Sequence, residues 1–283
     1  MSRKVRQTRG VGAAAQNGDS MDLGLTGKVA LVTGASSGIG RAVALQLGSE
    51  GADLMLTARR ANELEVVAGE ALKAGAKQAR WVVADLETED GPRAAVEAAA
   101  VQLGRLDVLI NNGVPTQVGG LSDFDEAGLL RAFEGKAVAY LRAARAAMPY
   151  LTQSGGGVIV NIGGAAGVSL MDHYLLGTMV VKAIRGMTSV LARNVAADGV
   201  RVVGVDPGPT ETGRLGPGLA AKAARRGVGV EVLRAELESE VPLGRLITPE
   251  EIAKVVTFLA SGAANQVTGT TVLVDGGYSR GVS

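Results

Sequence analysis

A glycine-rich segment near the start of the chain reads Thr33-Gly34-Ala35-Ser36-Ser37-Gly38-Ile39-Gly40. The apolar run Val29 to Thr33 before it is typical of a buried strand. After it, Ile39, Val43 and Leu47 recur every four residues and place one apolar stripe on a helix. A glycine-rich turn between a strand and a helix points backbone N–H groups, and the positive end of the helix dipole, at a pyrophosphate. This context predicts a dinucleotide-binding loop.

Beyond this segment, short apolar runs alternate with longer amphipathic stretches, as is typical of βαβ units around a parallel sheet. Right-handed crossovers predict an α/β Rossmann fold with a doubly wound, seven-stranded parallel sheet and a ligand site at the carboxyl ends of the strands. We find no internal repeat or linker, so residues 23–283 are expected to form a single domain. The expected strands are Val29 to Thr33, Leu54 to Thr57, Trp81 to Asp85, Val108 to Asn111, Val158 to Ile162, Val202 to Val205 and Thr271 to Val274.

The composition excludes several classes of site. The chain has no cysteine and a single histidine, His173, which excludes disulfides, a thiol nucleophile and a multi-histidine metal site, and we expect no metal. A net charge of +1 and an aromatic content of 3% argue against a nucleic-acid partner. No stretch approaches the roughly 20 apolar residues of a membrane span, and no apolar signal segment opens the chain. We therefore predict a cytoplasmic protein without a membrane partner.

The first residues differ in composition from the rest. Residues 1–20 carry Arg3, Lys4, Arg6 and Arg9 against Asp19 alone, with Gly and Ala clusters and no apolar periodicity. Residues 1–22 are therefore expected to be a disordered extension. We interpret it as a cloning remnant or the product of an upstream start, in preference to a functional basic arm.

Further motifs follow the other expected strands, and together with the glycine-rich loop they resemble the short-chain dehydrogenase/reductase family. The family's cofactor fingerprint is Thr-Gly-x-x-x-Gly-x-Gly, which residues 33–40 match. One departure is Asn111-Asn112-Gly113-Val114, where the family usually has Asn-Asn-Ala-Gly. The other matching motifs are Ala84-Asp85-Leu86, Pro207-Gly208-Pro209-Thr210-Glu211-Thr212, Pro242-Leu243-Gly244-Arg245 and Val274-Asp275-Gly276-Gly277.

The resemblance implies a nicotinamide cofactor, which would contact a set of residues spread over these motifs. Within that set, Asp85 would bond the adenine and Thr212 the nicotinamide carboxamide. The end of the second expected strand reads Thr57-Ala58-Arg59-Arg60, without the carboxylate that NAD-binding members usually offer to the ribose. A guanidinium pairs well with a phosphate, so Arg59, helped by Ser36, favours NADP over two solvated arginines. The cofactor-binding residues expected are Gly34, Ser36, Ser37, Gly38, Ile39, Gly40, Arg59, Asp85, Leu86, Asn111, Gly113, Pro207, Gly208, Thr210 and Thr212.

The catalytic positions of the family are occupied by unusual residues. Members usually act on carbonyls or alcohols with an Asn, a Ser, a proton-donating Tyr and a Lys that lowers the pKa of the Tyr. At the family's spacing these positions fall on Lys136, Gly164, Gly177 and Val181, so none of the four residue types is present. A register shifted by one residue would place Thr178 and Lys182 there. We prefer the ungapped register because it also aligns Gly186 and reaches Pro207 without a gap.

Two nearby residues are candidates for the missing chemistry. Tyr174 precedes the expected tyrosine position by three residues and would act as the acid, while Lys136 would supply the positive charge that depresses the pKa of a phenol. The alternatives are a Tyr174 that packs at the surface or at a subunit interface and a Lys136 that extends to solvent. His173 is a weaker candidate acid.

Two further expectations concern the substrate and the assembly. Residues 213–243 form an amphipathic, charge-rich stretch. In relatives this region is a mobile lid over the substrate, and the alternative for this chain is an ordinary surface helix. Relatives assemble through two long helices, here about 126–152 and 177–197, so a homodimer or homotetramer is expected by resemblance.

Three functions remain open. The first is an NADP(H)-dependent oxidoreductase acting on a small carbonyl or alcohol with an altered acid, because the cofactor motifs are retained. The second is a cyclase, dehydratase or isomerase on the same fold, with NADP structural or unused, which the loss of all four catalytic residue types favours. The third is an NADP-binding sensor protein. Fold by itself does not choose among them.

Overall fold

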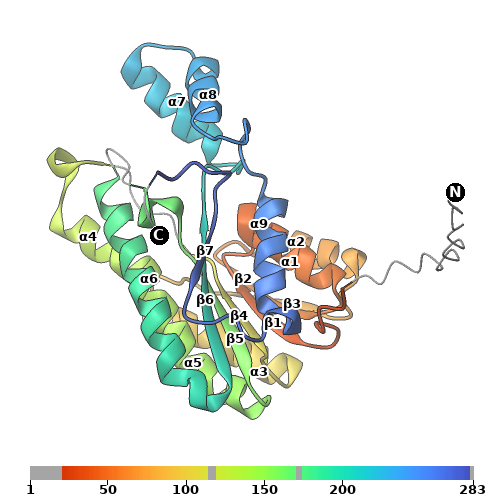
Figure 1. Ribbon diagram of the computed structural model, residues 1–283. Helices are drawn as coiled ribbons and strands as arrows, with labels where there is room; N and C mark the ends of the chain where they lie inside the picture. Colours follow the sequence, from red (N-terminus) through yellow and green to blue (C-terminus); the bar gives the residue numbers. More distant parts are fainter. Residues whose placement is uncertain (1–20, 114–118, 170–173, 281–283) are drawn as a thin grey trace, which may run out of the picture.

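Seven parallel strands form the sheet at the centre of the computed structural model, which describes residues 21–113, 119–169 and 174–280 (Figure 1). The strand order is β3-β2-β1-β4-β5-β6-β7. The chain adds strands outward from β1 to β3 on one side, and then returns to add β4 to β7 on the other side of β1. The predicted doubly wound fold is therefore confirmed. The strands are β1 (Val29–Thr33), β2 (Asp53–Ala58), β3 (Ala79–Val83), β4 (Val108–Asn111), β5 (Gly157–Ile162), β6 (Val200–Pro207) and β7 (Thr271–Val274).

One strand ends earlier than the sequence predicts. β3 stops at Val83 instead of Asp85, because Val83 pairs with Ala58, the last residue of β2. With no strand partner beyond that point, the chain turns, and the Asp85 carboxylate accepts a hydrogen bond from the Glu87 N–H at 3.0 Å. The turn brings Asp85 to the carboxyl edge of the sheet.

Helices cover both faces of the sheet (Figure 1). α1, α2 and α9 lie on one face, and α3, α5 and α6 lie on the other. The α-helices are α1 (Gly38–Ser49), α2 (Ala61–Ala74), α3 (Gly91–Leu103), α4 (Glu126–Ala132), α5 (Ala139–Gln153), α6 (Leu175–Val195), α7 (Leu215–Arg226), α8 (Val230–Ser239) and α9 (Pro249–Ala260). Shorter helical turns are η1 (Leu121–Asp123), η2 (Phe133–Val138), η3 (Ala165–Gly167), η4 (Ala196–Asp198) and η5 (Gly262–Ala264).

The apolar core has two layers, because alternate residues of each strand face opposite sides of the sheet. Leu31, Leu109 and Ile159 are packed with α3 and α5, whereas their neighbours in sequence belong to the cluster around α1 and α9. Leu31, Leu109 and Ile159 are each 1% exposed or less, and their neighbours are 3% exposed or less. Burial on both faces explains why the strands read as continuous apolar runs.

The helix expected over 126–152 is interrupted. α4 ends at Ala132, and the π-helical turn η2 carries Lys136 before α5 begins at Ala139. π-helical turns inside helices occur frequently at functional sites. The expected lid region contains α7 and α8, which project beyond the body of the molecule at the top of Figure 1.

One helical stretch among the described residues, Leu175–Asp198, is long and apolar enough to cross a membrane by composition. In the fold this stretch is α6 and η4, and Val180, Ile184 and Thr188 on α6 are buried. One face of this helix therefore packs into the core. The predicted absence of a membrane partner stays a prediction.

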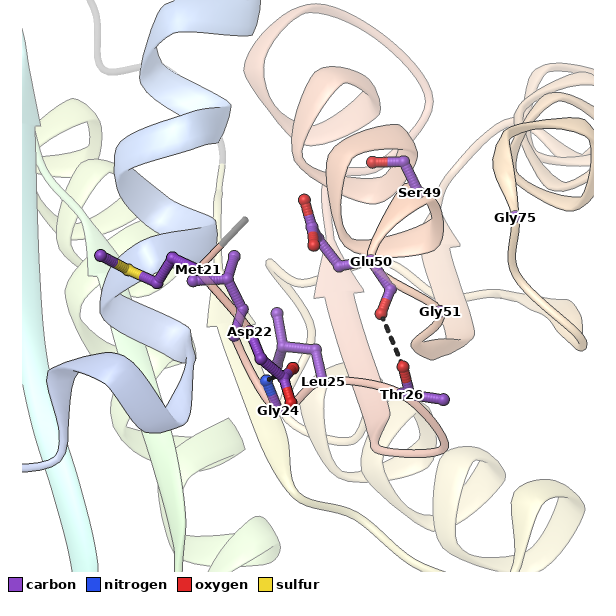
Figure 2. Close-up of a pocket in the computed structure, with 10 residues that line it drawn as sticks. Met21, Asp22, Gly24, Leu25, Thr26, Ser49, Glu50, Gly51 and Gly75 are labelled. Carbon is purple, nitrogen blue, oxygen red and sulfur yellow. Dashed lines mark hydrogen bonds between the residues drawn. The ribbon is translucent and has the colours of Figure 1, made fainter. Parts of the chain in front are cut away.

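Figure 2 shows a shallow pocket of about 380 Å³ formed where the segment Met21 to Thr26 crosses the ends of α1 and α2. The Thr26 hydroxyl donates to the Glu50 carbonyl there at 3.4 Å. Because these residues precede β1, β2 and β3, the pocket lies at the amino ends of the strands. It is therefore remote from the edge at which a doubly wound sheet binds ligands.

Candidate functional site

The turn from β1 to α1 is built from glycines that have no room for a side chain. Gly34 and Gly38 have positive φ angles of 60° and 54°, in the left-handed region that favours glycine. A Cβ at Gly40 would lie 2.6 Å from the Asn112 Nδ2 and closer still to the Gly34 carbonyl oxygen. Thr33 fixes the neighbouring loop, since its hydroxyl accepts from the Asn112 N–H at 2.9 Å. The loop therefore has a single compact path between strand and helix.

This path leaves the first turn of α1 open to a ligand. Ser37 is the N-cap residue, its side chain makes no capping hydrogen bond, and the N–H of Arg41 donates to its carbonyl at 3.3 Å. The preceding N–H groups, those of Gly38, Ile39 and Gly40, have no acceptor within the helix. Together with the helix dipole they have the geometry of an anion site. The pyrophosphate that the sequence places there stays a prediction.

The segment that follows β6 lies against the start of α1. A Cβ at Gly38 would lie 3.3 Å from the Thr212 Cγ2, so the two segments are in contact. Gly208 donates its N–H to Val274 at 2.9 Å, and the Thr210 hydroxyl donates to the Gly208 carbonyl at 2.8 Å. Pro207, at the end of β6, is buried. The predicted cofactor residues of β6 and β1 therefore lie at one site.

Positive charge gathers at the end of β2. The Arg59 side chain is 63% exposed, and its guanidinium is 3.8 Å from Glu87. The pKa of Arg214, which precedes α7, is lowered by burial and then by the charges of Arg59 and Arg60. Three arginines thus lie near one another at the carboxyl edge of the sheet, with Asp85 and the buried Leu86 at the neighbouring strand end.

Two of the expected cofactor residues after β4 have structural partners. The Asn111 side chain is buried, and its Nδ2 donates to Asn161 Oδ1 at 2.9 Å, so the amide links two strands. Gly113 donates its N–H to the Tyr140 hydroxyl at 2.7 Å, and that hydroxyl donates to the Ile162 carbonyl at 3.0 Å. Burial raises the pKa of Tyr140. Tyr140 thereby holds the chain after β4 in place, and no pattern in the sequence singled this residue out.

The end of β5 leads into Gly163 and Gly164, and Gly164 is the residue that the preferred register aligns with the serine of the family. Gly164 has no hydroxyl to offer, and its N–H donates to Asp206 Oδ1 at 2.9 Å. Val181 of α6 faces this turn, since its methyl carbons lie 3.3 Å and 3.8 Å from where Cβ atoms at Gly163 and Gly164 would be. The turn is therefore lined by an aliphatic side chain of α6.

Tyr174 lies across the first turn of α6 and fills the space next to Gly177. A Cβ built at Gly177 would lie 2.6 Å from Cδ1 of the Tyr174 ring and closer still to Cε1 and Cζ. The backbone holds this arrangement, because Leu175 donates its N–H to Gly119 at 3.0 Å and Thr178 donates to the Tyr174 carbonyl at 2.9 Å. The phenol of residue 174 thus takes the place of a side chain at 177.

Lys136, on η2, reaches the turn that follows β5. Its Nζ donates to the Gly163 carbonyl at 3.0 Å. Burial lowers the pKa of Lys136 to about 8, Asp206 opposes that effect, and Arg214 adds to it. The side chain therefore turns inward, and the interpretation of Lys136 as a solvated lysine is wrong.

The residues of the shifted register lie differently. Lys182 is exposed, and its Nζ donates to the Gly167 carbonyl at 3.3 Å. Thr178 is half-buried in the first turn of α6. His173 and residues 1–20 lie outside the described residues. Among the described residues, no group of three or more His, Asp or Glu side chains could hold a metal ion.

Sequence reasoning missed Asp206 and Arg185. The Asp206 carboxylate accepts from the Arg185 Nη1 at 2.6 Å and is 1% exposed. A carboxylate within an otherwise apolar strand, and an arginine within the apolar stripe of a helix, were the available signals. Arg214 was missed too. Its charge lowers the pKa of Lys136, and Tyr174 in turn raises the pKa of Arg214.

Known proteins are similar to this chain in sequence and in fold. A family model described as Enoyl-(Acyl carrier protein) reductase matches residues 34–279. The 3-oxoacyl-(acyl-carrier-protein) reductase FabG of Pseudomonas aeruginosa is 36% identical over 260 residues, which cover 90% of this chain and 98% of that protein. The chain belongs to the short-chain dehydrogenase/reductase family. A second member, cis-4-hydroxycyclohexanecarboxylate dehydrogenase of Sinomonas cyclohexanicum, is 34% identical over 258 residues, 89% of this chain and 96% of that protein.

Solved structures of this family agree with the fold. L-sorbose reductase from Gluconobacter frateurii, complexed with NADPH and L-sorbose, has a TM-score of 0.88 at 28% identity, covering 93% of this chain and all of that one. A variant of the actinorhodin polyketide ketoreductase with NADPH has a TM-score of 0.85 at 28% identity, covering 90% and 98%. This short-chain dehydrogenase/reductase is therefore an oxidoreductase with a nicotinamide cofactor, which confirms the predicted family, fold and enzyme class.

Proposed function

We propose that this short-chain dehydrogenase/reductase is an NADP(H)-dependent enzyme that interconverts a small carbonyl compound and its alcohol, with Tyr174 as its acid. The observation that carries the proposal is the Tyr174 ring in the space beside Gly177. In the family, the proton-donating phenol belongs to the residue at that position. A phenol supplied from three residues earlier replaces the missing side chain.

The preference for NADP rests on charge. No carboxylate ends β2, and the pKa of Arg214 is lowered by burial and then by repulsion from Arg59 and Arg60. A bound phosphate would relieve that repulsion through charge-assisted hydrogen bonds. Arg59, exposed and 3.8 Å from its nearest carboxylate, is free to reorient toward the 2′-phosphate.

The remaining cofactor contacts fit the same assignment. The first turn of α1 would hold the pyrophosphate, and Thr212, which contacts Gly38, would hold the nicotinamide carboxamide. When bound, the cofactor supplies the hydride for the carbonyl carbon. The protein then has to orient the carbonyl, exclude water and deliver a proton to the carbonyl oxygen.

The geometry favours the ungapped register for α6. Val181 faces Gly163 and Gly164, whereas Lys182 is exposed and bonds to Gly167. The lysine of the family is therefore replaced by an aliphatic side chain that cannot hold a ribose or depress the pKa of a phenol. Those two tasks have to be met by other residues.

Lys136 is the cation that we assign to the second task. It lies on η2, and its Nζ donates to the Gly163 carbonyl. Arg214 lies near enough for its charge to lower the pKa of Lys136, and Tyr174 lies near enough to affect the pKa of Arg214. A positive charge near a phenol stabilises the phenolate and so makes proton donation easier. Tyr174 gives its proton to the carbonyl oxygen and recovers one from solvent.

The lid and the assembly are part of the proposal. α7 and α8 share a small apolar cluster of their own, Leu219, Ala223 and Leu233, which suits a lid that moves as a unit. α4, α5 and α6 leave apolar side chains exposed, namely Leu130, Leu141, Met179 and Val190. Such a patch favours a homodimer or homotetramer formed through these helices.

Isotope transfer tests the function. The protein is incubated with NADPH deuterated at nicotinamide C4 and a panel of small aliphatic, cyclic and 3-oxoacyl ketones, and deuterium in the alcohol product is measured by mass spectrometry. We expect deuterated alcohol, a turnover at least about 10²-fold lower in Tyr174→Phe, and unchanged turnover in Tyr150→Phe, a half-buried tyrosine of α5.

Other results would favour the other functions. Conversion of a substrate without net oxidation of NADPH would indicate non-redox chemistry, which the absence of polar side chains at Gly164, Gly177 and Val181 would suit. Tight NADPH binding without any conversion would indicate a sensor. Full activity of Tyr174→Phe would exclude Tyr174 as the acid.

A further inference from the structure

An ion pair between the buried Asp206 and the half-buried Arg185 lies beneath the turn that follows β5, and the chemistry proposed above does not use it. Asp206 is 1% exposed, accepts from Arg185 at 2.6 Å, and accepts from the Gly164 N–H at 2.9 Å. Replacing a buried ion pair with apolar side chains is often neutral or stabilising. A contribution to folding stability is therefore a weak explanation for this pair. Its position beside the site favours a role in the site instead.

The sequence of the turn is adapted to the pair. A Cβ at Gly163 would overlap the Asp206 Oδ1, and a Cβ at Gly167 would lie 2.7 Å from the Arg185 Cδ and 3.1 Å from the Asp206 Oδ2. The absence of side chains at these two glycines thus makes room for the carboxylate and the guanidinium. The turn could not carry the pair with larger residues unless the backbone moved.

The turn also joins the pair to Lys136. Lys136 donates to the carbonyl of Gly163, and the next residue, Gly164, donates its N–H to Asp206. The two bonds run through consecutive residues, so a shift of Asp206 displaces the acceptor of Lys136. The ammonium and the carboxylate thus hold one short segment of backbone between them.

The charges around Lys136 leave Asp206 as its counterion. Asp206 on β6 and Arg214 before α7 are the charged groups that shift the pKa of Lys136, and in opposite directions. The nearby carboxylates are engaged elsewhere. Glu87, which lies against Gly135, is 3.8 Å from Arg59, and Glu134 of η2 is exposed and pairs with Arg142.

We propose that Asp206 is a positioning residue, which fixes the turn after β5 and supplies the negative charge that keeps Lys136 protonated. The inference rests on the proposed function, in which protonated Lys136 assists Tyr174. Arg185 acts by holding the Asp206 carboxylate in its ionised form. Asp206 itself touches neither the substrate nor the cofactor in this assignment.

The test measures the charge of Lys136 directly and needs no substrate. The full chain is labelled with lysine carrying ¹³C at Cε, and the Lys136 signal, assigned by its loss in Lys136→Arg, is followed against pH by NMR. We expect a wild-type midpoint near pH 8. In Asp206→Asn and in Asp206→Ser the midpoint should fall by about 0.5 to 1 unit, because an opposite charge has been removed.

A merely structural role would move the midpoint the other way. Loosening the turn would hydrate Lys136 and raise its midpoint toward the value of about 10.4 for a free lysine. A rise or no change in the folded Asp206 variants would therefore overturn the proposal. Folding of each variant is checked by circular dichroism, and two neutral replacements of different size guard against a misfolded variant.

A second ion pair with a buried carboxylate provides the matched control. Asp107 is 3% exposed and accepts from Arg105 at 2.6 Å, but it lies at the amino end of β4. Asp107→Asn should leave the Lys136 midpoint unchanged, and an equal shift there would also overturn the proposal. If the Asp206 variants lower the midpoint but Tyr174→Phe stays fully active, the network stands and the proposed acid is wrong.

Discussion

A single methyl group at Gly177 would separate a catalytic Tyr174 from a packing one. In Gly177→Ala the new Cβ would lie 2.6 Å from the ring Cδ1, whereas ordinary van der Waals contact begins at 3.4 Å. The ring must therefore retreat by at least about 0.8 Å, and further at Cε1 and Cζ, which lie closer. Because Tyr174 is half-buried, the ring can move toward solvent, where it gives up the contacts that it now makes.

The two consequences of this substitution have opposite signs. Alanine is favoured over glycine within a helix by about 1 kcal/mol, so stability should hold or rise despite the clash. A displacement of about 1 Å in a catalytic group costs on the order of 10²-fold in rate. We therefore expect the ketone reduction rate to fall about 10²-fold while the melting temperature is unchanged or higher.

The measurement combines kinetics, thermal unfolding and a probe of the ring. Reduction is followed with the best ketone of the isotope-transfer panel, and the Tyr174 environment by ¹⁹F NMR of protein labelled with 3-fluorotyrosine, assigned with Tyr174→Phe. The control is Gly69→Ala in α2, where a Cβ would meet nothing within 4 Å. A shifted Tyr174 signal with undiminished turnover in Gly177→Ala would refute the assignment of Tyr174 as the acid.

Three further predictions follow from the site. Arg59→Ala should weaken NADPH binding at least about tenfold, the loss of a charge-assisted hydrogen bond, and leave NADH binding and the control Arg93→Ala unaffected in a fluorescence titration. Gly40→Ala should lower the free energy of unfolding by about 1–3 kcal/mol and abolish NADPH binding, because its Cβ would lie 2.6 Å from an amide nitrogen and closer to a backbone carbonyl; the Gly69→Ala control should bind normally. Lys136→Met should raise the melting temperature at pH 7, where the folded state holds a buried ammonium with its pKa lowered to about 8. This gain should shrink as pH rises above 8, because folded Lys136 is then neutral while the unfolded chain still binds the proton; a gain independent of pH would contradict the lowered pKa.

The fold and the cofactor site were predicted from the sequence because both depend on local patterns. Seven apolar runs correspond to seven strands, because a parallel strand that is buried on both faces is apolar at nearly every position. The loop from Gly34 to Gly40 was recognisable because close contacts and positive φ angles require glycine at fixed positions. The end of β3 was misplaced by two residues, because a strand ends where its partner ends, and the partner is remote in sequence.

The catalytic positions show the limit of local reasoning. The sequence established which residue types are absent from Gly164, Gly177 and Val181, and nominated Tyr174 and Lys136 as replacements. It could not orient them, because side-chain direction depends on what each helix packs against. The structure turns Lys136 inward to a carbonyl 27 residues away and lays Tyr174 against the bare backbone of Gly177.

What the sequence by itself determined is the class of fold, the glycine-rich turn between β1 and α1, and the family, through its motifs. Only the tertiary structure revealed the pair formed by Asp206 and Arg185, which are 21 residues apart, on a strand and on a helix. Their signals in the sequence are two charged residues in apolar surroundings. Whether such charges meet depends on the register of β5 beside β6 and on the packing of α6, because burying either charge alone would be too costly.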